Sequence, residues 1–464
     1  MNSPLFLKSI IALGLTLTLS ACQPKPLTEQ EQRTVTQLTT NMKTQCVGRY
    51  LIDLPADVDI YGHAKLNDVD VKIEPMSQQA FLDGMHKRDA ELKAMKHIHG
   101  YQFLFGDNEY HPMNSSTEQM RKKGIWHFIH LDDEYSGDMG RTLEAYKWNK
   151  GYRIKLETKT WDYTRSIVKD KPRAKEMGNR VPSRLGDMMS LLHDFRGLSN
   201  GEIPKEPGVC LTGGFIKSEA SDEEEVSMSF YLRDKRDVSF DLETNSNIRE
   251  KTTLLQRGSQ IEKAVKTRDG HTIRKGKIDL PGLTSAEEWL LTGITNSKVM
   301  GHRFALEANS IVGSAQTPLL ILDMDNGAFP QDVPRDEIIK ASLTEGEAVA
   351  LWDAVSRTIR VRPGAMDAMP LPTVSATEHR LPLGTVVCSG QTCRQGGYYH
   401  THWNGETYRK LLCPDRPAPT LNLMEPVPYR WLPGLVNRML LKHERLPMAL
   451  ASHQVDWVLT SYFL

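Results

Sequence analysis

Three groups of side chains in this chain have the types and spacing of catalytic or metal-binding residues, and the first is built around Ser199. Gly197-Leu198-Ser199-Asn200-Gly201 matches the Gly-x-Ser-x-Gly pattern, in which a serine nucleophile sits on a sharp turn between a strand and a helix. Here apolar residues at helical spacing precede the serine, and Glu202-Ile203-Pro204 after it is typical of a linker. Because no helix is expected to follow, we do not assign catalysis to Ser199.

The second group, Asp323-Met324-Asp325, follows the apolar run Leu319–Leu322. This order resembles the start of haloacid-dehalogenase phosphatases, in which one aspartate attacks phosphorus and the other protonates the leaving group. Those enzymes need further residues on parallel strands, whereas this pair comes late, in a region whose alternation predicts antiparallel strands. We therefore interpret it as a strand that ends in an Asp-Asn-Gly turn.

The third group is C-terminal and consists of Cys388, Cys393, His400, His402 and Cys413. Sulfur and imidazole suit tetrahedral zinc, but the group lacks a Cys-x2-Cys pair. In an oxidising compartment such cysteines ordinarily form disulfides. We therefore expect two of Cys388, Cys393 and Cys413 to be bonded and one thiol to be left over, and we expect no metal and no cofactor.

Cys22 has a different chemistry, which residues 1–21 indicate. Lys8 and an apolar run that ends at Leu19 form a secretory signal, and the run is too short to span a membrane. The end of the signal resembles the lipobox of bacterial lipoproteins, with Leu19, Ser20, Ala21 and Cys22. In a lipobox the cysteine thiol is alkylated with diacylglycerol, the signal is removed and the new N-terminus is acylated. An ordinary cleavable signal followed by a cysteine is the alternative.

A lipid on Cys22 would hold the protein on a membrane in the periplasm, with residues 22–40 as a polar tether. Gln23 follows the cysteine, and because an aspartate there marks inner-membrane retention in such lipoproteins, we expect the outer membrane. The chain has 58 Lys+Arg and 58 Asp+Glu residues, and this balance argues against a nucleic-acid partner.

The oxidising periplasm also bears on Cys46 and Cys210. Each begins a run typical of a strand, and each follows a linker. We expect these two cysteines to be bonded, which would join the start of one domain to the start of the next. In the chain-entropy account, a loop of this length makes the bond worth on the order of 4 kcal/mol.

The 464 residues exceed what one core usually supports, and the expected elements repeat. Residues 41–200 show alternating strands, a helix after Ser77 and a closing helix from about Ser183. Residues 206–363 repeat this order and end in a helix with a Thr344/Glu347 capping box. The acidic run at 222–225 is expected to be a solvated loop. We predict an α+β fold of two similar antiparallel-sheet domains with packed helices, followed at 380–464 by a small β-rich, cysteine-containing module.

Three stretches resemble type VI secretion immunity proteins that neutralise phospholipase effectors: Cys46-Val47-Gly48-Arg49-Tyr50-Leu51-Ile52-Asp53-Leu54-Pro55, Gly208-Val209-Cys210, and Glu347–Val355 leading into Arg360-Val361-Arg362-Pro363. The resemblance covers about residues 40–365, and the C-terminal piece is loosely similar to an accessory module in other periplasmic immunity proteins. It implies a non-enzymatic protein that binds a cognate lipase effector one to one and blocks its lid or active-site mouth.

The resemblance further implies that the two domains, fixed at an angle by the Cys46–Cys210 bond, form the cleft that holds the effector. Two other functions remain open at this point. One is an outer-membrane lipoprotein that binds or transports lipid or envelope components, which would need a deep apolar cavity. The other is an envelope hydrolase, which would depend on Ser199 or Asp323.

Overall fold

The computed structural model describes residues 26–106, 117–122, 124–199, 201–283, 286–328, 338–366, 384–394, 397–403, 406–412, 418, 420–426 and 448–462. The chain divides into a larger unit, Met1–Met369, and a smaller unit, Pro370–Leu464. Within the described ranges, none of the helices combines the length and apolar character that a membrane span requires.

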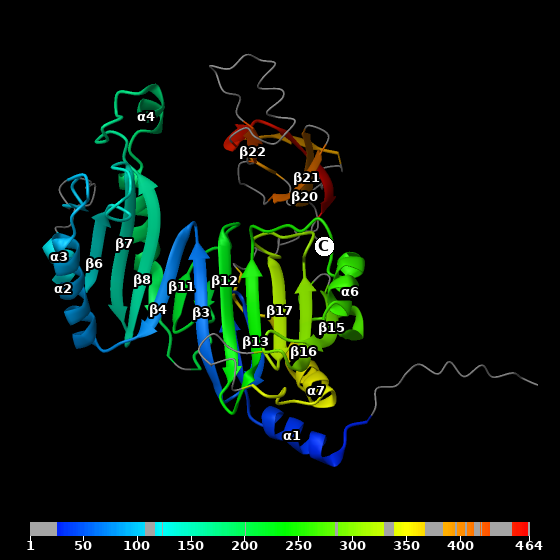
Figure 1. The fold of residues 1–464 in the computed structure, drawn as a ribbon. Coiled ribbons are helices and arrows are strands. Elements are labelled where there is room, and N and C mark those ends of the chain that lie inside the picture. Colours follow the sequence, from blue (N-terminus) through cyan, green and yellow to red (C-terminus); the bar gives the residue numbers. More distant parts are fainter. Residues whose placement is uncertain are drawn as a thin grey trace, which may run out of the picture. The chain divides into compact units, whose positions relative to one another are not determined.

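The larger unit is built on one 12-stranded sheet in the order β14-β15-β16-β17-β13-β12-β3-β4-β8-β7-β6-β5 (Figure 1). All neighbouring strands run antiparallel. Its strands from the first half of the chain are β3 (Val58–Leu66), β4 (Val69–Pro75), β5 (Leu104–Phe105), β6 (Ile125–His130), β7 (Gly140–Asn149) and β8 (Tyr152–Trp161). Its strands from the second half are β12 (Glu224–Leu232), β13 (Lys235–Asn245), β14 (His271–Ile278), β15 (Ala286–Ile294), β16 (Met300–Ala308) and β17 (Leu319–Asn326).

Alternating side chains give this sheet two different faces. On the face that we call the covered face, rows of apolar side chains run across the strands, for example Gly62, Met228, Leu242, Leu322 and Leu306 in successive register. The opposite, open face carries Tyr61 and His63 on β3, both exposed. The open face is also buried where helix α2 (Gln78–Ala94) covers it, because Trp126, Phe128 and Tyr146 of β6 and β7 belong to the core.

Each half of the unit packs one helix on each face of the sheet. The helices and the 3-10 turn of the unit are α1 (Glu29–Thr39), α2 (Gln78–Ala94), α3 (Thr117–Lys122), α4 (Pro172–Met177), α5 (Val181–Asp194), η2 (Leu255–Arg257), α6 (Gly258–Lys266) and α7 (Glu345–Ser356). On the covered face, Lys147 of β7 donates to carbonyls at the end of α5, and Trp352 of α7 packs edge-on against Phe304. On the open face, Arg88 of α2 pairs with Glu144, and Arg257 at the start of α6 pairs with Glu307. The predicted α+β class is confirmed.

Two small sheets lie against the large one. One has the order β1-β2-β18, with β1 (Met42–Val47), β2 (Tyr50–Pro55) and β18 (Arg360–Val361). The other has the order β10-β11-β9, with β9 (Phe195–Gly197), β10 (Gly208–Leu211) and β11 (Gly214–Lys217). The first small sheet joins the start of the unit to its end, and the second joins the last strand of the first half to the first two strands of the second half. Both small sheets therefore tie the two halves together.

The polar segment expected to be a tether is helical from Glu29 onward. Thr28 caps helix α1, and Glu31 completes a capping box. Glu31 also accepts a hydrogen bond from Thr344, the N-cap residue of α7, at 2.7 Å, and Val35 is buried. The tether prediction therefore does not hold for residues 29–39, because a capping box and one buried apolar side chain dock this helix on the folded unit.

The smaller unit contains only β-structure among its described residues. A four-stranded sheet has the order β19-β24-β20-β21, and β22 pairs with β23. The strands are β19 (Val386–Cys388), β20 (Gly397–Trp403), β21 (Glu406–Leu412), β22 (Leu421–Pro426), β23 (Met448–His453) and β24 (Asp456–Tyr462). Its own core includes Tyr399, Trp457 and Leu459. The β-rich character expected for this module matches the structure.

Candidate partner-binding surface

A disulfide and a pair of backbone hydrogen bonds join the two halves of the larger unit at one point. Cys46 of β1 and Cys210 of β10 are bonded, as predicted, with 164 residues of sequence separation. Gly48 and Cys210 exchange backbone hydrogen bonds of 2.9 and 2.8 Å. Gly48 has φ +57°, and a Cβ there would meet the Thr244 hydroxyl at 2.7 Å, so this position requires glycine.

Arg49 lies next to this junction, and its buried guanidinium uses all of its nitrogen atoms as hydrogen-bond donors. Only 2% of Arg49 is exposed, and its Nε and Nη2 bind both carboxylate oxygens of Glu224 at 2.8 and 2.6 Å. Its remaining donors bind the carbonyls of Glu219 and Ala365 at 2.8 and 2.5 Å. A planar guanidinium suits such a bidentate pair. Arg49 therefore connects the β1–β2 hairpin to the start of β12 and to the end of the unit.

Arg362, near the end of the larger unit, binds the linker between the two halves. It is 1% exposed, and it donates to the carbonyls of Pro204 and Gly208 at 2.5 and 2.6 Å. Burial and the nearby Arg49 charge lower the pKa of Arg362 to about 10. We name Cys46, Gly48, Arg49, Cys210, Glu224 and Arg362 the clasp.

The sheet itself divides at the same place, between β3 and β4. All of β3, from Val58 to Leu66, pairs with β12 of the second half. In contrast, β3 pairs with its own hairpin partner β4 only from Ala64 to Leu66. Strand β3 therefore belongs to a seven-stranded half-sheet with the second half of the chain, while β4 begins a five-stranded half-sheet with β8.

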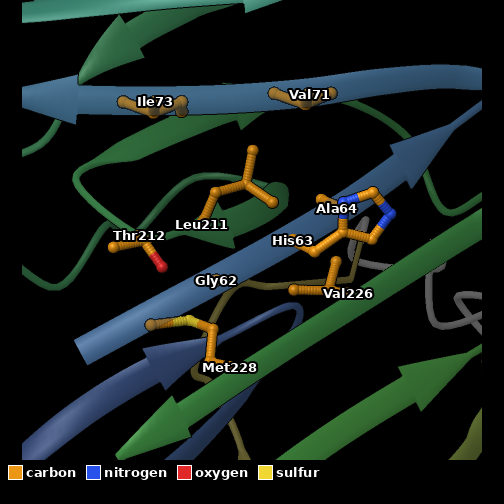
Figure 2. A pocket seen from close by; sticks show the side chains of 9 residues that line it. All are labelled: Gly62, His63, Ala64, Val71, Ile73, Leu211, Thr212, Val226 and Met228. Atoms are coloured by element: carbon orange, nitrogen blue, oxygen red, sulfur yellow. The ribbon is translucent and has the colours of Figure 1, made fainter. Parts of the chain in front are cut away.

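The two half-sheets diverge from the β3–β4 hairpin, and the β10–β11 turn closes the space beneath them. Figure 2 shows Leu211 and Thr212 between the diverging strands, with Ile73 on β4 and Gly62 on β3. A small cavity of about 10 Å³ remains there, which is roughly room for one water molecule. A Cβ on Gly62 would meet Thr212 Oγ1 at 2.0 Å, so glycine permits this close approach. We name the space between the two strands the split.

The open face beside the split is polar and, toward the second half, acidic. Asp241 of β13 lies opposite Asp323 of β17, and Asp325 lies one row away. Arg303 of β16 contacts Asp323 at 2.9 Å and Asp325 at 3.7 Å. The Arg303 guanidinium therefore forms ion pairs with two of these three carboxylates.

Burial is the main influence on the pKa values of these carboxyl groups. Burial, followed in effect by Asp323 and Asp241, raises the pKa of Asp325 to about 6, although Arg303 opposes the rise. Burial also raises the pKa of Asp323, again against Arg303. The same direction holds for Glu243, where burial acts together with Glu225 and Asp323. This row of the open face is therefore electrostatically strained near neutral pH.

Ser199 does not have the setting of a serine nucleophile. Strand β9, rather than the predicted helix, directly precedes it, because Phe195 is buried and pairs with Ile216 of β11. Its N–H is held by the Glu202 carboxylate at 3.2 Å, and a turn leads from it into the linker. The helix that the Gly-x-Ser-x-Gly motif requires does not follow.

Asp323 and Asp325 lie on β17, which runs antiparallel to both of its neighbours. This arrangement agrees with the strand interpretation, and it differs from the parallel sheet of the phosphatases. The strand extends through Asn326, one residue further than the aspartate pair.

The C-terminal cysteines are placed differently from one another. Cys388 is exposed and Cys393 is buried, and the two are not joined to each other. A hollow of about 410 Å³ is lined by residues that include Cys388, His402 and Asp456. A hydrogen bond to Asp456 raises the pKa of the Cys388 thiol, which disfavours a nucleophilic thiolate. Of the described residues, no group of three His, Cys, Asp or Glu side chains is arranged to hold a metal ion.

Several predicted positions lie outside the described residues: Leu19, Ser20, Ala21, Cys22 and Cys413. The lipid anchor and the pairing of the C-terminal cysteines therefore stay predictions.

Two residues of this region were missed at the sequence level. The acidic run 222–225 was interpreted as a solvated loop, but Glu224 begins β12 and binds Arg49, with only 12% of its side chain exposed. The second residue is Thr212, whose Oγ1 is buried and has no hydrogen-bond partner among the described residues. The alternation of polar and apolar residues from Glu224 onward indicates a strand and could have placed Glu224 in it. No sequence pattern indicates the position of Thr212.

Comparison with known proteins matches both halves of the larger unit to one family. The family model of the Tle cognate immunity protein 4 N-terminal domain matches residues 43–197. The model of the C-terminal domain of the same family matches residues 202–364. Together they cover more than half of the chain. No curated protein sequence matches the chain.

Two solved structures share the fold. A chain of the crystal structure of the Tle4-Tli4 complex has 19% identity and a TM-score of 0.52, over 70% of this chain and 99% of that chain. The apo structure of the immunity protein TplEi of T6SS from Pseudomonas aeruginosa has 20% identity and a TM-score of 0.51, over 69% and 97%. With both domain models matched in order, the chain belongs to the Tle cognate immunity protein 4 family.

Proposed function

We propose that this protein is a periplasmic, membrane-anchored immunity protein that binds a type VI secretion phospholipase effector and inhibits it by covering its lid or active-site mouth. The observation that carries this proposal is the match of both domain models across the larger unit. The related Tli4 chain is found in a complex with Tle4, and that arrangement suggests the kind of partner.

The clasp supports an inhibitor that binds its partner through a preorganised surface. Tight binding is favoured when the binding surface is organised before the partner arrives, because less ordering entropy is lost on association. Cys46–Cys210, Arg49 and Arg362 connect the two halves through one covalent bond and several buried hydrogen bonds. A surface that includes both halves is therefore held ready for a partner.

Chemistry by this protein itself is not needed for protection, and we propose that it is not an enzyme. Ser199 lacks the helix of a nucleophile turn, and Asp323 lies in an antiparallel sheet. Lipid transport would call for a deep apolar cavity. The cavity at the junction of the half-sheets holds about 10 Å³, and polar side chains contribute to the hollow near Cys388.

The anchor belongs to the same proposal. A triacylated Cys22 would station the inhibitor on a membrane facing the periplasm, most simply the outer membrane because Gln23 follows it. Tethering raises the local concentration of the inhibitor where the effector works.

Co-expression in bacteria tests the function directly. A type VI secretion phospholipase effector would be directed to the periplasm, with and without this protein, and survival and phospholipid content would be measured. We expect lysis with the lipase alone and rescue with this protein. Rescue that is lost in Ser199→Ala or Asp323→Ala while lipase binding persists would contradict a non-enzymatic inhibitor.

A further inference from the structure

Strand β3 lies in the middle of the 12-stranded sheet, yet part of its side toward β4 has no strand partner among the described residues. Among the described residues, Val58 to His63 pair with β12 on one side and have no strand partner on the other. Neighbouring residues of a strand direct their N–H and C=O groups to opposite sides, so alternate backbone groups of this stretch point into the split. A row of unpaired backbone donors and acceptors is a template for another strand.

The floor of the split carries a second, independent sign of a missing partner. Thr212 Oγ1 is buried beneath the split and has no hydrogen-bond partner among the described residues. Figure 2 shows the Thr212 side chain between Ile73 of β4 and Gly62 of β3. A buried hydroxyl without a partner costs about 1–3 kcal/mol in mutational data, so its retention calls for an explanation.

The rim of the split on the open face supplies an anchor. Tyr61 is 51% exposed and packs edge-on against Tyr231 of β12, with ring centroids 5.8 Å apart. His63 lies two residues along β3, and its Nε2 is 3.7 Å from Asp70 of β4. Exposed tyrosines are typical of the residues that contribute most to protein interfaces.

We propose that an extended segment of the effector adds to the edge of β3, between Val58 and His63, as an extra strand in the split. This inference rests on the proposed function and identifies the surface of this protein that binds the effector. The backbone of β3 supplies the main-chain hydrogen bonds, as in other cases of strand addition. The Cys46–Cys210 bond of the clasp holds β10, and the turn after β10 lies between β3 and β4, so the floor of the split is in place before binding.

The shape of the split determines the chemistry of that segment. The floor cavity holds only about 10 Å³, so the side chain facing Thr212 must be small. A serine there satisfies the Thr212 hydroxyl, whereas alanine or glycine fits without satisfying it. The neighbouring positions face the open side, where Tyr61 favours an apolar or aromatic side chain. The segment is therefore extended, with a small polar residue inward and a larger apolar residue outward.

Hydrogen exchange of the full-length chain in detergent, with and without the purified lipase, tests the placement. We expect amide exchange in residues 59–63 to slow at least about tenfold in the complex, because the unpaired groups gain partners. Binding without protection in this stretch would overturn the inference and leave the proposed function intact. Absence of both binding and inhibition would overturn the proposed function as well.

A pair of matched variants tests the contribution of the hydroxyl. Thr212→Val keeps the shape and removes Oγ1, and we expect it to weaken lipase affinity about threefold to tenfold without lowering the unfolding temperature of the free protein. Thr160→Val is the control, because Thr160 Oγ1 is also buried without a partner among the described residues and lies on β8. It should leave affinity unchanged. Equal affinities of Thr212→Val and wild type would contradict a role for this hydroxyl.

Discussion

Gly48 and Cys210 donate backbone N–H groups to each other's carbonyls, at 2.9 Å and 2.8 Å, beside the disulfide of Cys46 and Cys210. This single bridge joins the first strands of the two halves. Arg49 follows Gly48 in the sequence, and the Arg362 N–H donates to the Arg49 carbonyl. Both arginines are buried. The stretches that carry the family resemblance therefore serve to hold the halves of the sheet together.

The disulfide should contribute strongly to stability. Replacing both cysteines, Cys46→Ser with Cys210→Ser, releases a loop of 164 residues in the unfolded chain. In the chain-entropy account this lowers the free energy of unfolding by about 4–5 kcal/mol. Urea unfolding measures the change, and wild type under reducing conditions should show the same loss. A change below about 1 kcal/mol in both cases would show that the bond does little for the fold.

Arg49 should be harder to replace than an ordinary surface arginine. Arg49→Met leaves the Glu224 carboxylate buried without its partner, which costs about 3–5 kcal/mol of unfolding free energy. Adding Glu224→Gln removes the orphaned charge and should recover part of the loss. Thermal unfolding of the single and double variants measures this. If the double variant is no more stable than Arg49→Met, the unpaired carboxylate is not the cause.

The strained carboxyl row predicts a particular pH dependence. The pKa of Asp325 is about 6 when folded and 3.8 by reference, so the folded protein holds this proton more tightly. Its ionisation therefore costs stability, which falls as pH rises from about 4 to 6 and stays lower above that. One pKa unit corresponds to about 1.4 kcal/mol.

Asp325→Asn removes this ionisation and tests the sign. The variant should unfold at a higher temperature than wild type at pH 7.5, by about 2–4 °C for each kcal/mol recovered. At pH 3.5 the advantage should vanish, because Asp325 is then protonated in wild type. A lower unfolding temperature at pH 7.5 would mean that the pairing with Arg303 outweighs the cost of burial.

The anchor should affect location more than inhibition. Cys22→Ala prevents lipidation at the proposed site, so we expect weaker rescue of cells by the resulting protein. The purified variant should inhibit the lipase as well as the lipidated protein does. Membrane fractionation and a solution assay measure the two effects. Loss of inhibition in solution would show that the lipid takes part in binding.

Local patterns in the sequence predicted individual elements well. The Thr344/Glu347 capping box begins α7 as expected, and the closing helix expected from about Ser183 is α5. The pairing of Cys46 with Cys210 was also predicted. These features depend on spacing within a few residues or on the cysteine inventory.

Long-range pairing could not be predicted in the same way. The registry of β3 with β12 joins residues more than 150 positions apart, and no local pattern encodes it. No local pattern predicts that both halves share one sheet, or that β3 and β4 pair only from Ala64 to Leu66. Thr212 matters only because the split lies above it. Helix α1 carries a usable signal, the Thr28/Glu31 capping box, but its polar composition favoured the interpretation as a tether.

A stoichiometric titration tests whether this protein inhibits the lipase by binding it one to one. Purified lipase would be mixed with increasing amounts of the full-length chain, and phospholipid hydrolysis would be measured at a lipase concentration well above the dissociation constant. We expect lipase activity to fall linearly to zero at one molecule of this protein per lipase. Undiminished hydrolysis at a severalfold excess, or complete inactivation by far less than one equivalent, would contradict a binding inhibitor.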